Sequence, residues 1–516
     1  MTYGAYRMRG WTKGFRAALV ALAAMAVLPV LRSDALTNTG DIELASTANN
    51  NVPKGDAASL DVSLSADGRR VAFRSNASNL DPADTDATTD VYVKDLDTGQ
   101  IYLASASANG TKGNDFSGAP SLSADGTRVA FQSRASNLHP DDPDVRVDVF
   151  VKDLVTGEVF LASTADDGTK GDSDSFSPSL SADGTRVAFE SLAHNLDPAA
   201  PGPYGSQVYV KDLVTGDIVL ASTNDSGAAA NGFGNRSPDL SGNGRRVAFV
   251  SDATNLDPRV TGPFPNEAYV KDLDTGDITL ANTAADGTKG DGVLGSDFPT
   301  LSADGMQVAF SSFASNLVPW DGQGFGNQSE VYVKDLATAA IVRASSNDAG
   351  IRKPGASRVP ILSADATRVA FFSYAKLDPA DKTGGWDVYV KDLVTGETVL
   401  ATTDDSGTQT TLGLDGFDFA PSGRIVAFDS PATNLDPLDR DNILDVYVKV
   451  VADCHPAGAF GDGTLAQAIF GGQERERDGI VSSLEEQLEP HLGPAAPVAN
   501  EVGCLMAALE DVAGGQ

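Results

Sequence analysis

The stretch LSADGRRVAFRSNASNLDPADTDATTDVYVKDLDTGQIYLAS, residues 64–105, contains the end of one short strand and three further strand-like segments. The steps Asp67-Gly68 and Thr98-Gly99 are typical of tight hairpin turns, where glycine adopts positive φ. The apolar triplet at 71–73 and the segment at 91–93 are almost wholly apolar, which predicts strands buried on both faces. The stretch therefore predicts a small antiparallel sheet of four strands.

The same pattern recurs seven times between residues 41 and 451. Successive copies are 57 to 61 residues apart, measured between Asp67, Asp125, Asp183, Asn243, Asp304, Asp365 and Ser422. Four-stranded antiparallel sheets repeated around an axis form a β-propeller. We therefore expect an all-β, seven-bladed propeller over residues 36–451.

The seventh copy lacks its outermost strand, because VYVKVV (446–451) is followed by no Thr-Gly turn. The matching part, TNTGDIELAS, lies at residues 37–46 with no strand before it. We expect this N-terminal strand to complete the last blade and close the ring, which removes an open sheet edge.

Residues 1–35 carry basic side chains, then an apolar run at 17–31, then small residues, as in a secretory signal peptide. We expect export and a location outside the cell or in the cell envelope, with a retained anchor as the alternative. No cysteine follows the apolar run, so we expect no lipid attachment there. After removal of the signal, no other stretch could cross a membrane.

The net charge of −33 excludes nucleic acid as a natural partner and favours cations or basic partners, or simply solubility. Only Cys454 and Cys504 occur, and an exported chain predicts one disulfide between them. Both lie in residues 452–516, where apolar spacing predicts a small helical C-terminal region. Closure of the ring within one chain predicts a monomer.

The repeat LSADG-x-RVAF followed by DVYVKDL-x-TG resembles the WD-like propeller repeats of the TolB type. The resemblance covers residues 41–451 and implies the propeller fold. It implies no single function, because such repeats occur in binding proteins, peptidases and lyases. The chain departs from TolB itself because no α/β domain precedes the propeller. It also lacks the histidine cluster expected of the similar lyases and the G-x-S-x-G motif expected of the similar peptidases.

Strand direction places the Asp-Gly and Thr-Gly turns on one side of the ring and the long, varied loops on the other, where we expect the binding site. Three long loops carry the spacing D-x-D-x-x-x-D, which could hold calcium, although acidic turns at strand starts share it. The candidate ligands are Asp84, Asp86, Asp90, Asp142, Asp144, Asp148, Asp439, Asp441 and Asp445.

The corresponding loops of the third to sixth repeats carry aromatic residues instead. They are Tyr204, Phe264, Trp320, Phe325 and Trp386. Exposed aromatic rings often anchor sugars or peptides, whereas rings folded back would only cover the blade edges. The lysine of VYVKDL recurs in all seven repeats, which indicates a structural role, with Asp95 and its equivalents as candidate partners.

These observations favour an exported, non-enzymatic propeller that binds a protein, a peptide or a cell-wall glycan through the long-loop side, with calcium as a candidate cofactor. The alternative is a carbohydrate-active enzyme that uses paired acids on the same side. A purely structural envelope component is a third interpretation.

Overall fold

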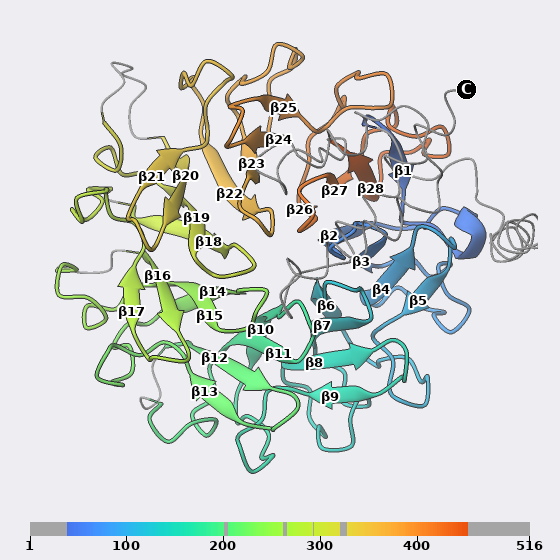
Figure 1. Cartoon of the computed structure of the whole chain (residues 1–516). Coiled ribbons are helices and arrows are strands. Elements are labelled where there is room, and N and C mark those ends of the chain that lie inside the picture. Colours follow the sequence, from blue (N-terminus) through green and yellow to red (C-terminus); the bar gives the residue numbers. More distant parts are fainter. Residues whose placement is uncertain (1–38, 201–204, 262–265, 293, 320–327, 452–516) are drawn as a thin grey trace, which may run out of the picture. The chain divides into compact units, whose positions relative to one another are not determined.

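The computed structural model describes residues 39–451, except 201–204, 262–265, 293 and 320–327. Twenty-eight strands form seven four-stranded antiparallel sheets, arranged around one axis like the blades of a propeller (Figure 1). In the described part, the one helical element is the 3-10 turn η1 (Asn49–Asn51). The predicted all-β propeller of seven blades is confirmed.

In each blade the strands are counted from the innermost, nearest the axis, to the outermost. The innermost strands are β2 (Ser59–Leu64), β6 (Ser117–Leu122), β10 (Ser175–Leu180), β14 (Asn235–Leu240), β18 (Ser296–Leu301), β22 (Ser357–Leu362) and β26 (Phe417–Phe419). The second strands are β3 (Arg70–Ser75), β7 (Arg128–Ser133), β11 (Arg186–Ser191), β15 (Arg246–Ser251), β19 (Gln307–Ser312), β23 (Arg368–Ser373) and β27 (Ile425–Ser430).

The two outer positions of each blade continue the same order. The third strands are β4 (Asp90–Asp95), β8 (Asp148–Asp153), β12 (Gln207–Asp212), β16 (Glu267–Asp272), β20 (Glu330–Asp335), β24 (Asp387–Asp392) and β28 (Asp445–Val450). The outermost strands are β5 (Ile101–Leu103), β9 (Val159–Leu161), β13 (Ile218–Leu220), β17 (Ile278–Leu280), β21 (Ile341–Arg343), β25 (Thr398–Leu400) and β1 (Ile42–Leu44). Blades 1 to 6 begin at β2, β6, β10, β14, β18 and β22, and blade 7 begins at β26.

The N-terminal strand closes the ring as predicted. Strand β1 pairs antiparallel with β28, in the register Ile42 to Lys449 and Leu44 to Tyr447. Blade 7 therefore has the strand order β1-β28-β27-β26 and joins the two ends of the propeller segment.

Backbone hydrogen bonds also form a closed circuit at the inner turns. The turn of each blade donates an N–H to the carbonyl of the next turn at 2.8–3.1 Å, from Ala66, Ala124, Ala182, Asn243, Ala303 and Ala364, and finally from Ser422 back to Ala66. Glycine supplies the positive φ that this turn needs in six blades, for example Gly68 at 71°, and Ala366 adopts 51° in blade 6.

The recurring lysine of the third strand links neighbouring blades. Lys94 donates to the carbonyl oxygens of Thr47, Ala48 and Gly99 at 2.8–3.0 Å. Lys152 makes the equivalent three contacts with Ala106, Ser107 and Gly157. The structural role is confirmed, but the expected partner is wrong, because Asp95 pairs instead with Arg70 at 3.1 Å.

Apolar side chains fill the space between blades. Val71, Phe73 and Tyr92 of blade 1 pack in one buried cluster with Ala427 and Val448 of blade 7. Strands that contact a neighbouring blade on each side must be apolar on both faces, which explains the continuous apolar triplets. The C-terminal region, with its expected helices and the Cys454–Cys504 bond, lies outside the described residues, as does the expected signal peptide at 1–35.

Candidate binding face

The two sides of the ring differ in their connections. Tight turns join the first strand of a blade to its second and the third to its fourth, and together they form what we call the turn face. The longer second-to-third connections and the links to the next blade form the loop face, for example residues 76–89 and 104–116. Variable loops on a rigid frame commonly carry binding sites, so the loop face is the candidate face.

The three acidic groups predicted from the sequence do assemble on the loop face. In each group, one oxygen from every carboxylate lies within 4.8 Å of the others. The first and third residues of each group are buried, as for Asp84 and Asp90, while Asp86 is exposed. Such groups could hold a metal ion, since calcium is bound by clustered carboxylate oxygens.

A lysine ammonium is already in contact with all three carboxylates of each group. Lys112 Nζ lies 3.6 Å from Asp84, 3.1 Å from Asp86 and 2.8 Å from Asp90. The corresponding distances for Lys170 are 3.4, 3.0 and 2.8 Å to Asp142, Asp144 and Asp148. Lys54 lies 3.6, 3.1 and 2.5 Å from Asp439, Asp441 and Asp445. We call these three arrangements the lysine-centred triads.

The sequence interpretation missed these lysines because they lie outside the acidic loops. Each belongs to the link that follows the outermost strand, and Lys54, Lys112 and Lys170 make the same isolated β-bridge in their respective repeats. Aligning the repeats would have revealed them, because Thr-Lys-Gly at 111–113 recurs at 169–171.

In the other blades different side chains take the places of the triad lysine and its carboxylates. Blade 4 pairs Glu267 with Lys289, and blade 5 pairs Glu330 with Arg352. In blade 6 a neutral Gln409 donates to Asp381 and Asp387 at 3.1 and 2.9 Å. Blade 3 has Gln207 at the acidic position and Ala229 at the basic one. A buried carboxylate needs a partner, which is a basic side chain in blades 4 and 5 and a neutral amide in blade 6.

Burial and the ion pairs act in opposite directions on these groups. Burial raises the pKa of Asp90, Asp148 and Asp445 to about 6, although the lysines pull it down. Burial also opposes the charge on Lys112, yet contacts with Asp90 and Asp86 raise its pKa above the ordinary value. At neutral pH Asp90, Asp148 and Asp445 are therefore mostly charged, and so is Lys112.

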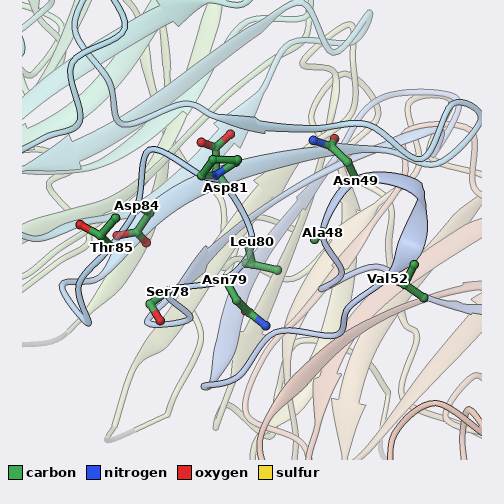
Figure 2. Close-up of a pocket in the computed structure, with 10 residues that line it drawn as sticks. Ala48, Asn49, Val52, Ser78, Asn79, Leu80, Asp81, Asp84 and Thr85 are labelled. Atoms are coloured by element: carbon green, nitrogen blue, oxygen red, sulfur yellow. The ribbon is translucent and has the colours of Figure 1, made fainter.

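An open pocket of about 390 Å³, lined by both polar and apolar side chains, lies beside one triad at the junction of the last and first blades. Figure 2 shows Ala48, Asn49 and Val52 of the N-terminal segment on one side and the loop with Asn79 and Asp81 on the other. Its volume suits a small ligand. Asp84 belongs both to this cavity and to the triad centred on Lys112.

Of the predicted aromatic residues, only Trp386 is among the described residues; Tyr204, Phe264, Trp320 and Phe325 lie outside them. The Trp386 ring packs edge-on against Phe372 and Tyr374, with centroids 6.5 and 5.9 Å away. The Arg358 guanidinium lies 4.2 Å above it. Trp386 is thus half-buried and packs against its neighbours in blade 6.

A different set of apolar side chains is exposed on the loop face of blades 3 to 6. We call it the apolar sector, and its members are between 36% and 62% exposed: Leu192, Phe233, Leu294, Phe298 and Tyr374. They lie near the inner ends of the blades, just after a second strand, just before a first strand, or within one. The sequence interpretation missed Phe233, Leu294 and Phe298 because they lie outside the loops between second and third strands, and it did not single out Leu192 and Tyr374 within those loops.

Most equivalent positions of blades 1, 2 and 7 are small or polar: Ala57, Asp61, Asn76, Asp115, Ala119, Arg134 and Pro431. The exception is Leu412 of blade 7, which precedes Gly413 as Leu294 precedes Gly295 and is 43% exposed. Val145 and Leu438 are also exposed in the loops of blades 2 and 7, so the apolar sector is distinguished by its position near the axis. Exposed apolar patches often mark interaction sites.

The inner strands carry carboxyl groups with raised pKa. Burial raises the pKa of Asp239 to about 7 and of Asp418 to about 6. Each accepts the N–H of the next inner strand, Leu301 for Asp239 and Leu64 for Asp418, at 2.7 and 2.6 Å. Burial likewise raises the pKa of Asp429 to about 7. The bonds of Asp239 and Asp418 link neighbouring inner strands.

No protein-family model and no curated protein matches the chain. Among solved structures it is similar to TolB from Acinetobacter baumannii, at 16% identity over 64% of this chain and 66% of that one, with a TM-score of 0.35. It is also similar to an oligogalacturonate lyase from Vibrio parahaemolyticus, at 13% identity over 80% and 99%, with a TM-score of 0.47.

A third similar structure is an acylaminoacyl peptidase from Pyrococcus horikoshii, at 13% identity over 73% of this chain and 49% of that one, with a TM-score of 0.42. These likenesses carry no inference about activity, and the similar structures include enzymes of different kinds. Within the described residues, no helix is long and apolar enough to span a membrane.

Proposed function

We propose that the protein is an exported binding propeller that engages a partner through the apolar sector of its loop face. The observation that carries this proposal is the concentration of large exposed apolar side chains near the axis in blades 3 to 6, which Leu412 continues into blade 7. Aromatic anchors such as Phe233, Phe298 and Tyr374 bury large areas on binding, and residues of this kind commonly dominate interface energetics.

The rest of the loop face supplies a rigid frame for this sector. The lysine-centred triads hold the loops of blades 1, 2 and 7 to the links beside them. We infer that lysine, and not calcium, is the resident cation there, because a calcium ion would have to displace a buried ammonium from its three carboxylates. Partner candidates are an envelope or extracellular protein, a peptide or a glycan, and the signal-like sequence at 1–35 supports export.

Hydroxyl-radical footprinting of the purified protein, with and without cell-envelope extract, tests this proposal. We expect the extract to protect Phe233, Phe298 and Tyr374 from oxidation. Val155, Val214 and Val394 are the matched control, because they are at least as exposed but lie at turns of the opposite face. Equal labelling of the three aromatic residues with and without extract, or protection confined to the valines, would exclude the apolar sector as the contact surface.

A further inference from the structure

Three carboxyl groups lie near one another on the loop face, close to the axis, where blade 7 meets blade 1. Asp61 lies in the innermost strand β2, Asp415 lies two residues before β26, and Asp429 lies in β27. Strand β2 packs against both β26 and β27. We call these three residues the acidic cluster. Its basic neighbour is Arg74, which contacts Asp61 at 2.6 Å, so the cluster has more acidic than basic side chains.

One oxygen of the acidic cluster is buried without a hydrogen bond. Asp429 is 1% exposed, and its Oδ1 accepts the N–H groups of Asp415 and Gly416, both at 2.9 Å. Its Oδ2 accepts none. A Cβ on Gly416 would lie 3.0 Å from this Oδ2, so the carboxyl lies directly beneath a glycine that is partly exposed. A buried polar atom without a partner is costly and indicates a place that a further group can stabilise.

The members of the acidic cluster also oppose one another's charge. Burial raises the pKa of Asp429 to about 7, and the charges of Asp415 and Asp61 act in the same direction. Burial likewise raises the pKa of Asp61, which Asp415 reinforces and Arg74 opposes. A cation placed beside the cluster would relieve this repulsion.

The cation that fits the cluster is a long side chain and not a metal ion. Among the described residues, the acids whose oxygens converge closely enough to hold a metal are those of the lysine-centred triads. The Asp61 side chain is 43% exposed and already pairs with one guanidinium, and Asp415 is exposed beside it in the cluster. A second guanidinium or an ammonium on a flexible stem reaches such carboxylates without requiring all their oxygens to converge.

An exposed apolar side chain lies next to these acids in the chain. Leu412 is 43% exposed and precedes Asp415 by three residues, and it continues the apolar sector into blade 7. The loop face therefore presents apolar side chains and uncompensated carboxylates together. The complementary surface combines basic and apolar side chains, and the net charge of −33 attracts such a partner over longer distances.

We propose that the acidic cluster binds a lysine or arginine of a basic, amphipathic polypeptide segment, whose apolar side chains contact Leu412 and the apolar sector. This inference rests on the proposed function and names the partner class for that face. A neutral glycan brings no cation to Asp61 and Asp415, and an acidic glycan is repelled by them.

A synthetic fluorescent peptide of leucine and arginine, patterned as an amphipathic helix, tests the proposal. Its binding to the purified full chain is measured by fluorescence anisotropy at physiological ionic strength. One counterpart has glutamate in place of arginine, and the other has glycine in place of leucine. We expect both counterparts to bind at least about tenfold more weakly than the leucine-arginine peptide.

Asp61→Asn with Asp415→Asn removes the two accessible carboxylates of the cluster and should weaken binding of the leucine-arginine peptide by at least about tenfold. Leu412→Ala should also weaken it. The matched control is Glu158→Gln with Glu397→Gln, which removes two exposed carboxylates beside Thr-Gly turns of the turn face. This control should change the affinity by less than about twofold.

Unfolding curves of every variant separate lost binding from lost folding. The proposal is overturned if the leucine-arginine peptide does not bind, if either counterpart binds equally well, or if Asp61→Asn with Asp415→Asn binds like the wild type. It is also overturned if the control pair weakens binding as much, since the peptide would then respond to negative charge in general. Protection of Phe233 and Phe298 by envelope extract would still support the binding face in each of these cases, so the two proposals fail separately.

Discussion

Lys54 Nζ lies 2.5 Å from Asp445 Oδ2, and this contact joins the first segment of the propeller to its last blade. Both side chains are largely buried, and the same ammonium also contacts Asp439 and Asp441. The backbone ladder between β1 and β28 is only three residue pairs long. The triad therefore reinforces the point where the ring closes.

Substitution of Lys54 by alanine should destabilise the propeller by about 3 kcal/mol, because it leaves buried carboxylates without a countercharge. Lys54→Gln should destabilise the protein less than Lys54→Ala, since Gln409 donates hydrogen bonds to two carboxylates at the same position in blade 6. Urea unfolding followed by circular dichroism measures both changes.

Lys382→Ala is the control for this substitution, because Lys382 is exposed and its ammonium contacts only the carbonyl of Pro379 among the described residues. Equal unfolding midpoints for Lys54→Ala and Lys382→Ala would show that the triad does not stabilise ring closure.

Calcium should leave the melting temperature of the wild-type protein unchanged, and a chelator should also have no effect. In Lys112→Ala, the three carboxylates Asp84, Asp86 and Asp90 lose their ammonium. Calcium should then raise the melting temperature, since a bound ligand stabilises the folded state. Stabilisation of the wild type by millimolar calcium, reversed by chelator, would instead support calcium as its resident cation.

The raised pKa values predict that stability increases at mildly acidic pH. Asp239 and Asp429 titrate at about 7 and Asp418 at about 6 in the folded protein, against an ordinary value of 3.8. The folded state thus binds protons more tightly than the unfolded chain, so stability falls as pH rises from about 4 to 7. We expect the free energy of unfolding to be at least about 2 kcal/mol higher at pH 5 than at pH 8.

The control for this pH dependence is Asp239→Asn, which keeps an oxygen acceptor for the Leu301 N–H but cannot titrate. The free energy of unfolding should differ less between pH 5 and pH 8 in this variant than in the wild type. A wild-type protein that is less stable at pH 5 than at pH 8 would contradict the raised pKa values of these carboxyl groups.

Ala366 adopts a φ of 51° at the turn position that glycine occupies in the other blades. Ala366→Gly should stabilise the protein by about 0.5–1 kcal/mol, because a Cβ is strained in this conformation. Gly350→Ala should instead destabilise the protein, because Gly350 is an exposed glycine whose φ is 71°. Thermal unfolding of the two variants measures both changes in stability. A loss of stability in Ala366→Gly would contradict the claim that Ala366 is strained.

The fold could be predicted from the sequence because the turn, the apolar triplet and VYVKDL repeat at a nearly constant interval. The missing strand of the last copy even predicted the pairing of β1 with β28. The partner of the recurring lysine could not be predicted, because Lys94 bonds backbone carbonyls of a neighbouring blade, which no residue pattern identifies.

The candidate site was predicted only in part. The carboxylates of each triad are close together in sequence, so spacing revealed them, whereas the lysine comes from a separate link across the blade. The exposed apolar residues were missed because an exposed and a buried aromatic residue look alike in a repeat. Phe298 is exposed through a register shift in β18, where its φ is 54°.

The measurement that tests the central claim most directly is capture of envelope components by a variant with Phe233→Ala, Phe298→Ala and Tyr374→Ala. The matched control carries Val155→Ala, Val214→Ala and Val394→Ala on the turn face. We expect the loop-face variant to lose the components that the wild type and the turn-face variant both retain, with unchanged unfolding curves. Retention by the loop-face variant, or loss only in the turn-face variant, would contradict a binding role for the apolar sector.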